Sequence, residues 1–364
     1  MRVIVSAGGT GGHIYPALAI IKKILKEEPN SEILYIGTHN RMEKDIIPKE
    51  GIKYEAIEIT GLKRSLSLSN VKTVINFYKS YKKCLKVIND FNPDIVIGAG
   101  GYVTAPVIFA AKKLGKKTFI HEQNSVVGLA NKFLSKYSDK IGVSFESTLS
   151  CFDKDKVVLT GNPCSEKALD IEPINKAELG LSNDKKLVLI VMGSLGSKTI
   201  NEKLVTYLDS FKYKEYEVLF VTGKNFYENV KNLKVSDNVK IVPFIDNLSR
   251  VMKVTDVMIS RSGASTMSEI SVLGVPTIFI PSPYVTNNHQ YKNAMDLVNK
   301  NAALIIEEDK LTNELLLNNI DSLINDSDKI NKIKNNLENI GIKDSSTRIY
   351  NILKDMIIDD RKFY

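Results

Sequence analysis

The chain alternates short strand-like runs with helix-like segments, and the alternation begins again about halfway along its 364 residues. The strand-like runs of the first half are RVIVS, EILYIG, YEAIEI, DIVIGAG, KTFIHE and KIGVS, and those of the second are KKLVLIVMGS, YEVLFVTG, NVKIVPF, DVMISRSG, PTIFIPSP and AALIIEE. Segments with helical periodicity, such as YPALAIIKKILKEE, separate them. This pattern indicates parallel βα units with helices on both faces of a sheet. The sequence therefore predicts an α/β fold with two doubly wound, Rossmann-like domains.

The boundary between the halves is expected in VVLTGNPCSEKALDIEP, where Pro163 and Pro173 interrupt the pattern. We place the first domain at residues 1–162 and the second at residues 163–341. The last segment, SSTRIYNILKDMIIDD, is amphipathic and needs a surface to pack on. Ligands of doubly wound sheets bind at the carboxyl ends of the strands, so a cleft between two such domains is the expected place for a site.

The net charge of +8 favours an acidic partner, such as a phosphorylated ligand, a nucleic acid or an anionic membrane surface. Solvated surface lysines would explain the charge equally well. The first apolar run is broken by Gly8 and Gly9, which does not fit a signal peptide, and no apolar run reaches the length that crosses a bilayer. These features predict a cytoplasmic protein whose membrane contact, if it has one, is peripheral.

A glycine-rich turn, SAGGTGGH, follows the first strand and precedes a helix. Glycines let a backbone approach a ligand closely, and the N-terminus of the following helix favours an anion. The turn does not match a dinucleotide fingerprint, because Ile14 stands where a small residue is needed and Thr38 ends the second strand in place of an acid. It lacks the Gly-Lys-Ser/Thr of a P-loop. The sequence therefore predicts phosphate binding of another type.

Two more glycine turns, GAGGYVTAP and MGSLGSKTIN, also follow predicted strands. Polar residues gather at further strand ends, in HEQN at residues 121–124, in SRSG at residues 260–263 and in NNHQ at residues 287–290. Three of the four histidines, His13, His121 and His289, fall in these stretches. Tight packing alone can require one glycine turn, but three turns together with these polar clusters favour a phosphate or sugar site.

The motifs GGTGGHIYPALA, GAGGYVTAP, HEQNSVVGLANKFL, GNP, GSLGSKTIN, RSGASTMSE and NNHQYKNA occur in this order along nearly the whole chain. Together they resemble the MurG family, whose members transfer N-acetylglucosamine in peptidoglycan synthesis. The resemblance implies the two-domain GT-B fold, with the last helix, residues 342–364, returning to the first domain. It implies an inverting transfer from UDP-N-acetylglucosamine to the 4-hydroxyl of the muramoyl sugar of lipid I, which forms lipid II. No cofactor or metal is expected.

The resemblance also assigns roles to residues. Glu269 would bind the ribose diol, the backbone at Ile245 would face uracil, and Gln290 would hold the transferred sugar. The diphosphate would lie at the helix N-terminus formed by Ala264, Ser265 and Thr266, with Ser194 beside it. Residues of the first domain would close over the donor: Thr10, Gly11, Gly12 and Asn124.

His13 is the favoured general base for the acceptor hydroxyl, because an ordinary histidine titrates near neutral pH. Glu122 could share or orient that role, so the identity of the base stays open. Family members often have GNPVR where this chain has GNPCS. Ser165, itself counted among the substrate-binding residues, therefore stands in the place of an arginine near the donor. The phosphate contact there is either weaker or supplied by another residue, for which Lys198 is a candidate.

The lipid acceptor implies peripheral attachment to the cytoplasmic face of the cell membrane. A candidate is the segment from Val71 to Lys86, in which Val71, Val74, Ile75, Tyr78 and Leu85 form an apolar stripe flanked by Lys72, Lys79, Lys82, Lys83 and Lys86. An ordinary helix packed on the sheet is the alternative. Asp153 and Asp155 have a spacing that some metal-dependent transferases use, but they are expected to form a solvated turn.

The nearest competing function is a UDP-N-acetylglucosamine epimerase of the same fold, which would use the donor site without a lipid acceptor. A nicotinamide oxidoreductase conflicts with Ile14 and Thr38. A nucleic-acid-binding module would explain the charge but not the polar strand ends, so no nucleic acid partner is expected. The peptide variant of the acceptor, the oligomeric state and the closure of the domains stay open.

Overall fold

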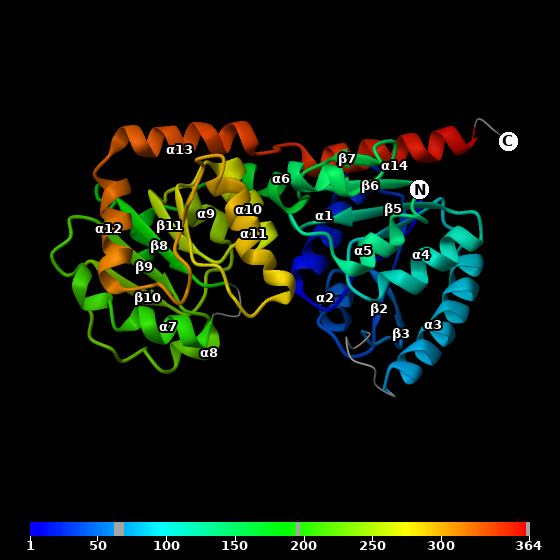
Figure 1. Ribbon diagram of the computed structural model, residues 1–364, viewed down its shortest axis with the longest axis horizontal. Helices are drawn as coiled ribbons and strands as arrows, with labels where there is room; N and C mark the ends of the chain where they lie inside the picture. Colours follow the sequence, from blue (N-terminus) through cyan, green and yellow to red (C-terminus); the bar gives the residue numbers. More distant parts are fainter. Residues whose placement is uncertain (62–68, 194–196, 362–364) are drawn as a thin grey trace. The chain divides into compact units, whose positions relative to one another are not determined.

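The computed structural model describes residues 1–61, 69–193 and 197–361 (Figure 1). The chain divides into two compact units, Met1–Cys164 with Asp344–Tyr364, and Ser165–Lys343. These junctions lie within two residues of the boundaries that we placed at 162 and 342. In the described part of the chain, no helix combines the length and apolar character that crossing a membrane requires.

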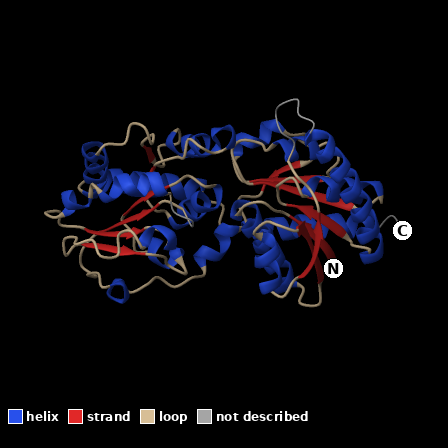
Figure 2. Ribbon diagram, turned by 90° about the horizontal axis from the view of Figure 1, so that it is seen from below, coloured by secondary structure: helices blue, strands red, loops and turns tan. Residues whose placement is uncertain are grey.

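The first unit is a seven-stranded parallel sheet covered by helices (Figure 2). Its strands are β1 (Arg2–Ser6), β2 (Glu32–Thr38), β3 (Lys53–Ile57), β4 (Ile95–Gly98), β5 (Lys117–Glu122), β6 (Lys140–Val143) and β7 (Val157–Leu159). Its helices are α1 (Gly11–Glu27), α2 (Glu43–Lys49), α3 (Ser69–Phe91), α4 (Thr104–Lys113), α5 (Leu129–Leu134) and α14 (Ser345–Arg361), with the 3-10 helix η1 (Glu146–Cys151). Helix α6 (Cys164–Leu169) begins at the junction of the units.

The second unit holds a six-stranded parallel sheet. Its strands are β8 (Leu187–Val191), β9 (Glu217–Val221), β10 (Val239–Val242), β11 (Val257–Ser260), β12 (Thr277–Phe279) and β13 (Leu304–Ile305). Its helices are α7 (Lys198–Val205), α8 (Lys224–Tyr227), α9 (Leu248–Met252), α10 (Ala264–Leu273), α11 (His289–Val298), α12 (Asn313–Ile324) and α13 (Ser327–Ile340), with the 3-10 helices η2 (Lys176–Leu179), η3 (Leu208–Phe211) and η4 (Thr286–Asn288).

The second sheet repeats the strand order of the first, which has one further strand, β7, at its edge. The order is β3-β2-β1-β4-β5-β6-β7 in the first unit and β10-β9-β8-β11-β12-β13 in the second. Every pair of neighbouring strands is parallel. The order reverses direction between β1 and β4 and again between β8 and β11, and ligands of such sheets bind at the point of reversal. The predicted α/β fold with two Rossmann-like domains is confirmed.

The last helix, α14, packs in the first unit, although the chain enters it from the second. Ile349 and Leu353 of α14 share a buried cluster with Ile14 and Ile21 of α1. The hydroxyl of Tyr350 donates a hydrogen bond to Glu28 Oε1 over 3.0 Å, which fixes the far end of α1. Figure 1 draws α14 in red and α1 in blue. Helix α1 therefore provides the surface on which this amphipathic segment buries its apolar face.

Candidate active site

The glycine turns that follow β1 and β4 interlock at the point where the first sheet reverses its strand order. The amide of Gly8 donates a hydrogen bond to the carbonyl of Gly100 over 3.2 Å. Gly101 has a φ of +89°, and a Cβ atom there would lie 2.4 Å from the carbonyl oxygen of Gly8. Only glycine satisfies both conditions at residue 101. The glycines of these two turns are therefore needed for the packing of one turn against the other, whether or not a ligand binds there.

His13 lies in the first turn of α1, and the two glycine turns hold its ring. Its Nδ1 lies 3.0 Å from the carbonyl oxygen of Gly8. Because a carbonyl oxygen only accepts, Nδ1 carries the proton in the neutral ring and Nε2 is the basic nitrogen. The other side of the ring faces Gly100, where an added Cβ would lie 2.5 Å from the ring atom Cδ2. The geometry defines the orientation and the tautomer that a general base requires.

Replacing Gly100 with alanine should displace this ring. We expect Gly100→Ala to lower kcat by about 10²-fold, because a displacement of about 1 Å in a reacting group has an effect of that size. Gly115→Ala is the matched control, since Gly115 also has a positive φ, +69°, but faces open space. Equal losses of activity in the two variants would show that backbone strain, not the position of His13, is responsible.

Glu122, the other candidate base, lies at the end of β5 and is buried. Its Oε1 accepts from the backbone amide of Asn124 over 3.1 Å, and its Oε2 accepts from the amide of Gly128 and from Nδ2 of Asn131, each over 2.9 Å. A carboxylate with these partners holds the loop between β5 and α5 in shape. Both carboxylate oxygens of Glu122 are thus occupied by hydrogen bonds from its own loop and from α5. This arrangement favours a role in positioning Asn124 over direct proton transfer.

His121 precedes Glu122 at the end of β5, as the run KTFIHE predicts, and its side chain lies in the core and not at the surface. Its ring is fully buried, with Nε2 2.9 Å from the carbonyl oxygen of Gly161 and Nδ1 3.2 Å from Nε2 of Gln123. Burial lowers the pKa of His121 to about 4, so the ring is neutral at pH 7. Gln123 also donates to the carbonyl of Ala99 over 3.0 Å. This network ties together the ends of β4, β5 and β7.

Glu43, at the start of α2, contacts the first glycine turn, and no sequence pattern pointed to it. Its side chain is fully buried and accepts from the amide of Gly9 over 3.1 Å, from the amide of Thr38 over 3.2 Å and from the hydroxyl of Thr38 over 2.6 Å. The sequence around it, RMEKD, reads as an exposed helix start, because charged residues surround it. Its burial arises only where the ends of β1 and β2 meet.

In the second unit the end of β11 leads directly into α10, as the sequence predicts. Helix α10 begins with Ala264, Ser265 and Thr266, and the buried hydroxyl of Ser265 has no hydrogen-bond partner among the described residues. The helix ends at Leu273, where Gly274 adopts a φ of +67°. A helix N-terminus with an unpaired buried hydroxyl suits a phosphate oxygen, since the first-turn amides and the helix dipole both favour an anion.

Arg261, directly before this helix, is a second residue whose role the sequence did not reveal. Its guanidinium is buried, donates to the carbonyl of Ile280 over 2.8 Å and to Oγ of Ser197 over 3.0 Å, and pairs with Glu308 at 2.6 Å. It thereby joins the start of α7 to the ends of β11, β12 and β13. The pairing with Glu308 compensates the buried charge.

Gln290 in α11 is held close to the turn that precedes α10. The hydroxyl of Ser262 donates to the carbonyl of Gln290 over 2.7 Å, and Nδ2 of Asn293 donates to the carbonyl of Ser262 over 3.2 Å. The side-chain oxygen of Gln290 accepts from the amide of Ser282 over 2.9 Å. The structure therefore brings the SRSG and NNHQ stretches together, as the order of the sheet requires.

Glu269 lies in the second turn of α10 and is partly buried. Burial raises the pKa of Glu269 to about 7, and a hydrogen bond with Ser249 and the charge of Lys167 act in the opposite direction. A carboxyl group poised near neutral pH in a partly buried position is typical of a functional site. Donors such as hydroxyl groups would favour its charged form.

This pKa predicts a pH dependence of stability. Because the folded-state value of about 7 exceeds the ordinary value of 4.5, the stabilising contribution of the protonated form is complete below pH 4.5 and is lost as the pH rises through 7. We expect Glu269→Gln to raise the melting temperature at pH 8 and to have less effect at pH 5. Glu215→Gln, at an exposed carboxyl of the same unit, controls for the lost charge. A constant difference between Glu269→Gln and the unmodified protein across pH 5–8 would contradict the assignment.

The other predicted donor residues have different surroundings. Ile245 is partly buried in the turn after β10, ahead of α9. Ser165, which stands in the place of the family arginine, is buried, and its hydroxyl donates to the carbonyl of Ile342 over 3.3 Å. Lys198 is exposed at the start of α7, with Nζ 3.8 Å from Glu202. Ser194 lies outside the described residues.

The predicted residues at the start of α1 lie together. Thr10 is the exposed residue that precedes the helix, and Gly11 and Gly12 are its first two residues. Asn124 follows β5, which is separated from β1 in the sheet only by β4. In the first unit the structure therefore brings Thr10, Gly11, Gly12, His13 and Asn124 to the carboxyl edge of one sheet.

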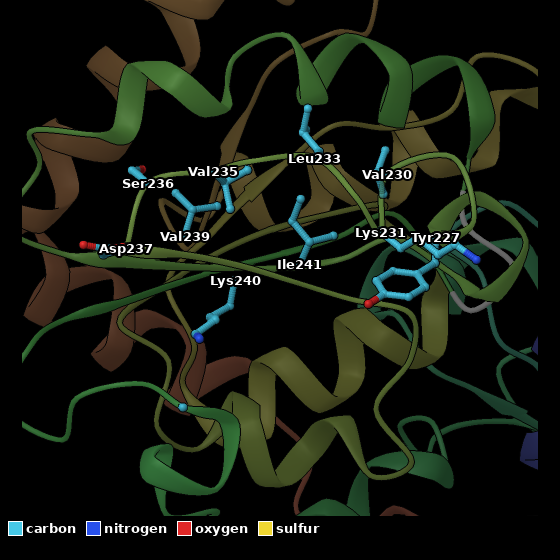
Figure 3. Close-up of a pocket in the computed structure, with 11 residues that line it drawn as sticks. Tyr227, Val230, Lys231, Leu233, Val235, Ser236, Asp237, Val239, Lys240 and Ile241 are labelled. Atoms are coloured by element: carbon cyan, nitrogen blue, oxygen red, sulfur yellow. The ribbon is translucent and has the colours of Figure 1, made fainter.

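Two further features lie apart from these residues. Asp153 Oδ1 accepts from the amide of Asp155 over 3.0 Å in an exposed turn, and the described residues contain no cluster of three His, Cys, Asp or Glu side chains that could hold a metal ion. A pocket of about 420 Å³ lies at the β10 edge of the second sheet, where Tyr227, Lys231 and Lys240 border it (Figure 3). None of the predicted site residues lines this pocket.

Comparison with known proteins agrees with the resemblance seen in the motifs. Residues 3–143 match the glycosyltransferase family 28 N-terminal domain, and residues 187–349 match the glycosyltransferase family 28 C-terminal domain. A relative from Bacillus cytotoxicus, named UDP-N-acetylglucosamine--N-acetylmuramyl-(pentapeptide) pyrophosphoryl-undecaprenol N-acetylglucosamine transferase, is 46% identical over 98% of this chain and 100% of its own length. A Bacillus subtilis protein of the same name is 45% identical over 98% of this chain and 99% of its own.

Solved structures show the same relationship. The crystal structure of MurG from Acinetobacter baumannii has a TM-score of 0.80 and 25% identity, and the match covers 97% of this chain and 99% of that one. A UDP-GlcNAc 2-epimerase from Neisseria meningitidis has a TM-score of 0.67 at 17% identity over 98% of this chain and 100% of its own, which is a likeness of fold alone. The chain therefore belongs to glycosyltransferase family 28 and is a hexosyltransferase of the N-acetylglucosamine transferase group that includes MurG.

Proposed function

We propose that the chain transfers N-acetylglucosamine from UDP-N-acetylglucosamine to the 4-hydroxyl of the muramoyl sugar in lipid I, with inversion at the anomeric carbon, and so forms lipid II. The names of the Bacillus relatives support the donor and the acceptor. The observation that carries the chemistry is the orientation of His13, whose Nδ1 is fixed by Gly8 so that Nε2 is the basic nitrogen. An inverting transfer needs one base and no covalent sugar intermediate.

The second unit supplies the donor site in this proposal. The diphosphate binds at the N-terminus of α10, where Ser265 offers a buried hydroxyl and the helix dipole stabilises the charge that develops on the leaving group. Glu269, further along the helix, accepts hydrogen bonds from the ribose diol. Gln290 contacts the sugar and Ile245 the uracil. This distribution of charge requires no bound metal, so transfer should persist in the presence of a chelator.

The first unit supplies the base and the acceptor site. His13 Nε2 takes the proton of the attacking hydroxyl, while Thr10, Gly11, Gly12 and Asn124 line the same edge of the sheet. Glu122 holds the loop that carries Asn124. In this assignment Glu122 positions the site and His13 performs the proton transfer.

An epimerase is the second candidate, and it is favoured only by the likeness of fold. The two functions differ in what happens to UDP-N-acetylglucosamine without an acceptor. An epimerase converts it to the C2 epimer, whereas the proposed transferase leaves it intact. Incubation with the donor alone, followed by separation of the two UDP-sugars, distinguishes them, and formation of the epimer would contradict the proposal.

The outer face of α3 is the proposed membrane contact. Val74, Ile75 and Tyr78 form an apolar patch in which each side chain is at least 50% exposed. At this end of the helix the face toward the protein carries the buried polar residues Thr73, Asn76 and Ser80, with Thr73 hydrogen-bonded to Thr60 over 3.0 Å. Further along, Cys84 and Ile88 lie in the apolar core. The first described turns of α3 therefore point apolar side chains outward and polar ones inward, whereas its second half packs as an ordinary amphipathic helix.

The patch is narrower than the stripe we expected from the sequence. Leu85 packs against the core beneath the helix, so it does not belong to the outer face. The side chains of Val71 and Lys72 lie outside the described residues. Exposed lysines follow the patch along the helix: Lys79, Lys82, Lys83 and Lys86. Lysines beside an exposed apolar patch favour an anionic lipid surface, here the cytoplasmic face of the cell membrane.

A charge placed in the apolar patch should release the protein from anionic vesicles. We expect Ile75→Glu to weaken binding by about 10-fold or more, since it removes buried apolar area and adds repulsion. Leu233→Glu is the control, because Leu233 is also an exposed apolar residue (45%) but lies in the second unit. Sedimentation with vesicles that contain or lack anionic lipid measures both. Equal binding of Ile75→Glu and the unmodified protein would exclude this face.

A further inference from the structure

Glu43 and His13 are bonded to opposite ends of the same peptide group. The peptide between residues 8 and 9 presents its N–H, from Gly9, to Oε2 of Glu43 at 3.1 Å, and its carbonyl, from Gly8, to Nδ1 of His13 at 3.0 Å. A chain of two hydrogen bonds therefore runs from a carboxylate through one peptide to the imidazole. We propose that Glu43 is a positioning residue that orients His13 and raises its basicity through this peptide, and the proposal rests on the role of His13 as the general base.

The direction of the effect follows from the charges. A negative acceptor on the N–H polarises the peptide and increases the negative charge on its carbonyl oxygen, because hydrogen bonds in a chain strengthen one another. The carbonyl then binds the Nδ1 proton of His13 more strongly and stabilises the imidazolium that forms when Nε2 takes a proton. A carboxylate bonded directly to histidine acts in this way in hydrolases. Here one peptide lies between the two groups.

The surroundings of Glu43 fit a charged group. Its side chain is fully buried, and its three donors are the amide of Gly9 and the amide and hydroxyl of Thr38. Among the described residues no cation pairs with it. Shape alone does not require a carboxylate at this position, since a neutral amide would also fill the space, and burial of a charge without a cation is costly. Packing alone therefore does not explain why a carboxylate, and not a neutral side chain, stands at residue 43.

The groups around Glu43 do not titrate in the pH range in which the pKa of His13 would be measured, with the exception of carboxylic acids. The phenols of Tyr35 and Tyr54 face it from β2 and β3, and burial followed by the charge of Glu43 raises the pKa of both well above the ordinary value. Both phenols therefore stay neutral between pH 5 and pH 9. Asp45, exposed on the same helix, is the remaining acid beside Tyr54. Of the described contacts of His13, the carbonyl of Gly8 and the backbone of Gly100 carry no titratable group.

The first test is a nuclear magnetic resonance titration of the ring of His13 in the full-length protein. The chain has four histidines, so His13→Ala assigns the signal. We expect Glu43→Gln to lower the pKa of His13 by about one unit, the size of a screened interaction between charges in a protein. Asp45→Asn removes an equal charge from the same helix and should leave the pKa of His13 unchanged. An unchanged pKa in Glu43→Gln, or an equal decrease in Asp45→Asn, would overturn the proposal.

Kinetics supply a second readout. In Glu43→Gln we expect kcat to fall by about 10- to 100-fold, with the donor KM within a factor of about 3, and the acidic limb of the kcat profile to move to lower pH. A purely structural loss would lower kcat without that movement. If His13→Ala retains normal kcat while Glu43→Gln still shifts the pKa of His13, the assignment of the base fails and the coupling stands.

A third measurement requires no variant at Glu43 and covers the case in which Glu43→Gln does not fold. In the unmodified protein, protonation of His13 should strengthen both hydrogen bonds of the chain. The amide proton of Gly9 should therefore move downfield with the same midpoint as the ring of His13. An amide of Gly9 that does not respond while the ring titrates would contradict the coupling.

Discussion

His13→Ala should lower kcat by about 10²–10⁴-fold, the usual contribution of a general base. The expectation follows from the placement of the ring, which Gly8 and Gly100 hold so that Nε2 is the basic nitrogen. The donor KM should change little, because the base acts on the acceptor hydroxyl. This is the largest effect that we expect from any single side chain.

His39→Ala provides the matched control for this variant. His39 is exposed and follows β2 in the same unit, so its loss removes a histidine without disturbing the turns around His13. A kcat within a few-fold of the unmodified enzyme in His13→Ala would transfer the role of base to another group. Glu122 would then be the next candidate, although it already accepts hydrogen bonds from Asn124, Gly128 and Asn131.

Glu269→Ala should raise the donor KM by about 10- to 100-fold. Loss of hydrogen bonds to a charged group leaves the ribose hydroxyls without their acceptor, and each such bond is worth about 1.5–3 kcal/mol. The pKa of about 7 adds a second signature. In the unmodified enzyme the donor KM should rise as the pH falls below 7, because the protonated carboxyl accepts fewer hydrogen bonds, and this dependence should vanish in Glu269→Ala.

Glu215→Ala controls for the change in charge, since Glu215 is exposed in the same unit. Initial rates at several donor concentrations and at pH 6, 7 and 8 separate KM from kcat. A donor KM in Glu269→Ala that matches the unmodified enzyme at all three values would remove Glu269 from the donor site.

Much of the fold could be predicted from the sequence because the pattern of a parallel sheet is local. Each buried strand is a short apolar run, and each run is followed by a turn of glycines or polar residues. These turns predicted that α1 and α10 each begin shortly after a strand ends, and the structure shows both helices there. The end of α10 is local in the same way, because Gly274 adopts a positive φ there and Pro276 follows two residues later.

The residues that the sequence missed depend on contacts between distant segments. Glu43 has charged neighbours in the sequence and becomes buried only because Gly9 and Thr38 meet above it. Arg261 finds its counter-ion, Glu308, in a segment that follows a different strand. No periodicity or spacing records such pairs, so local patterns could not have revealed them.

Burial sets the surroundings of two further residues that the sequence singled out. The sequence predicted His121 at the end of a strand among the polar residues of a site, but its side chain is fully buried in β5, where it is neutral. Ser165 stands in the position of a family arginine, yet its hydroxyl donates to the carbonyl of Ile342. A motif identifies which residues belong to a region, whereas their exposure, which decides what each one can contact, requires the packed structure.

The most direct test of the account is sugar transfer itself. The purified protein would be incubated with labelled UDP-N-acetylglucosamine, with and without a lipid I analogue, and both the label and the released UDP would be followed. The account predicts label in the lipid product and equimolar UDP, each dependent on the acceptor. Release of UDP or formation of an epimer without acceptor, with no label in the lipid, would contradict it.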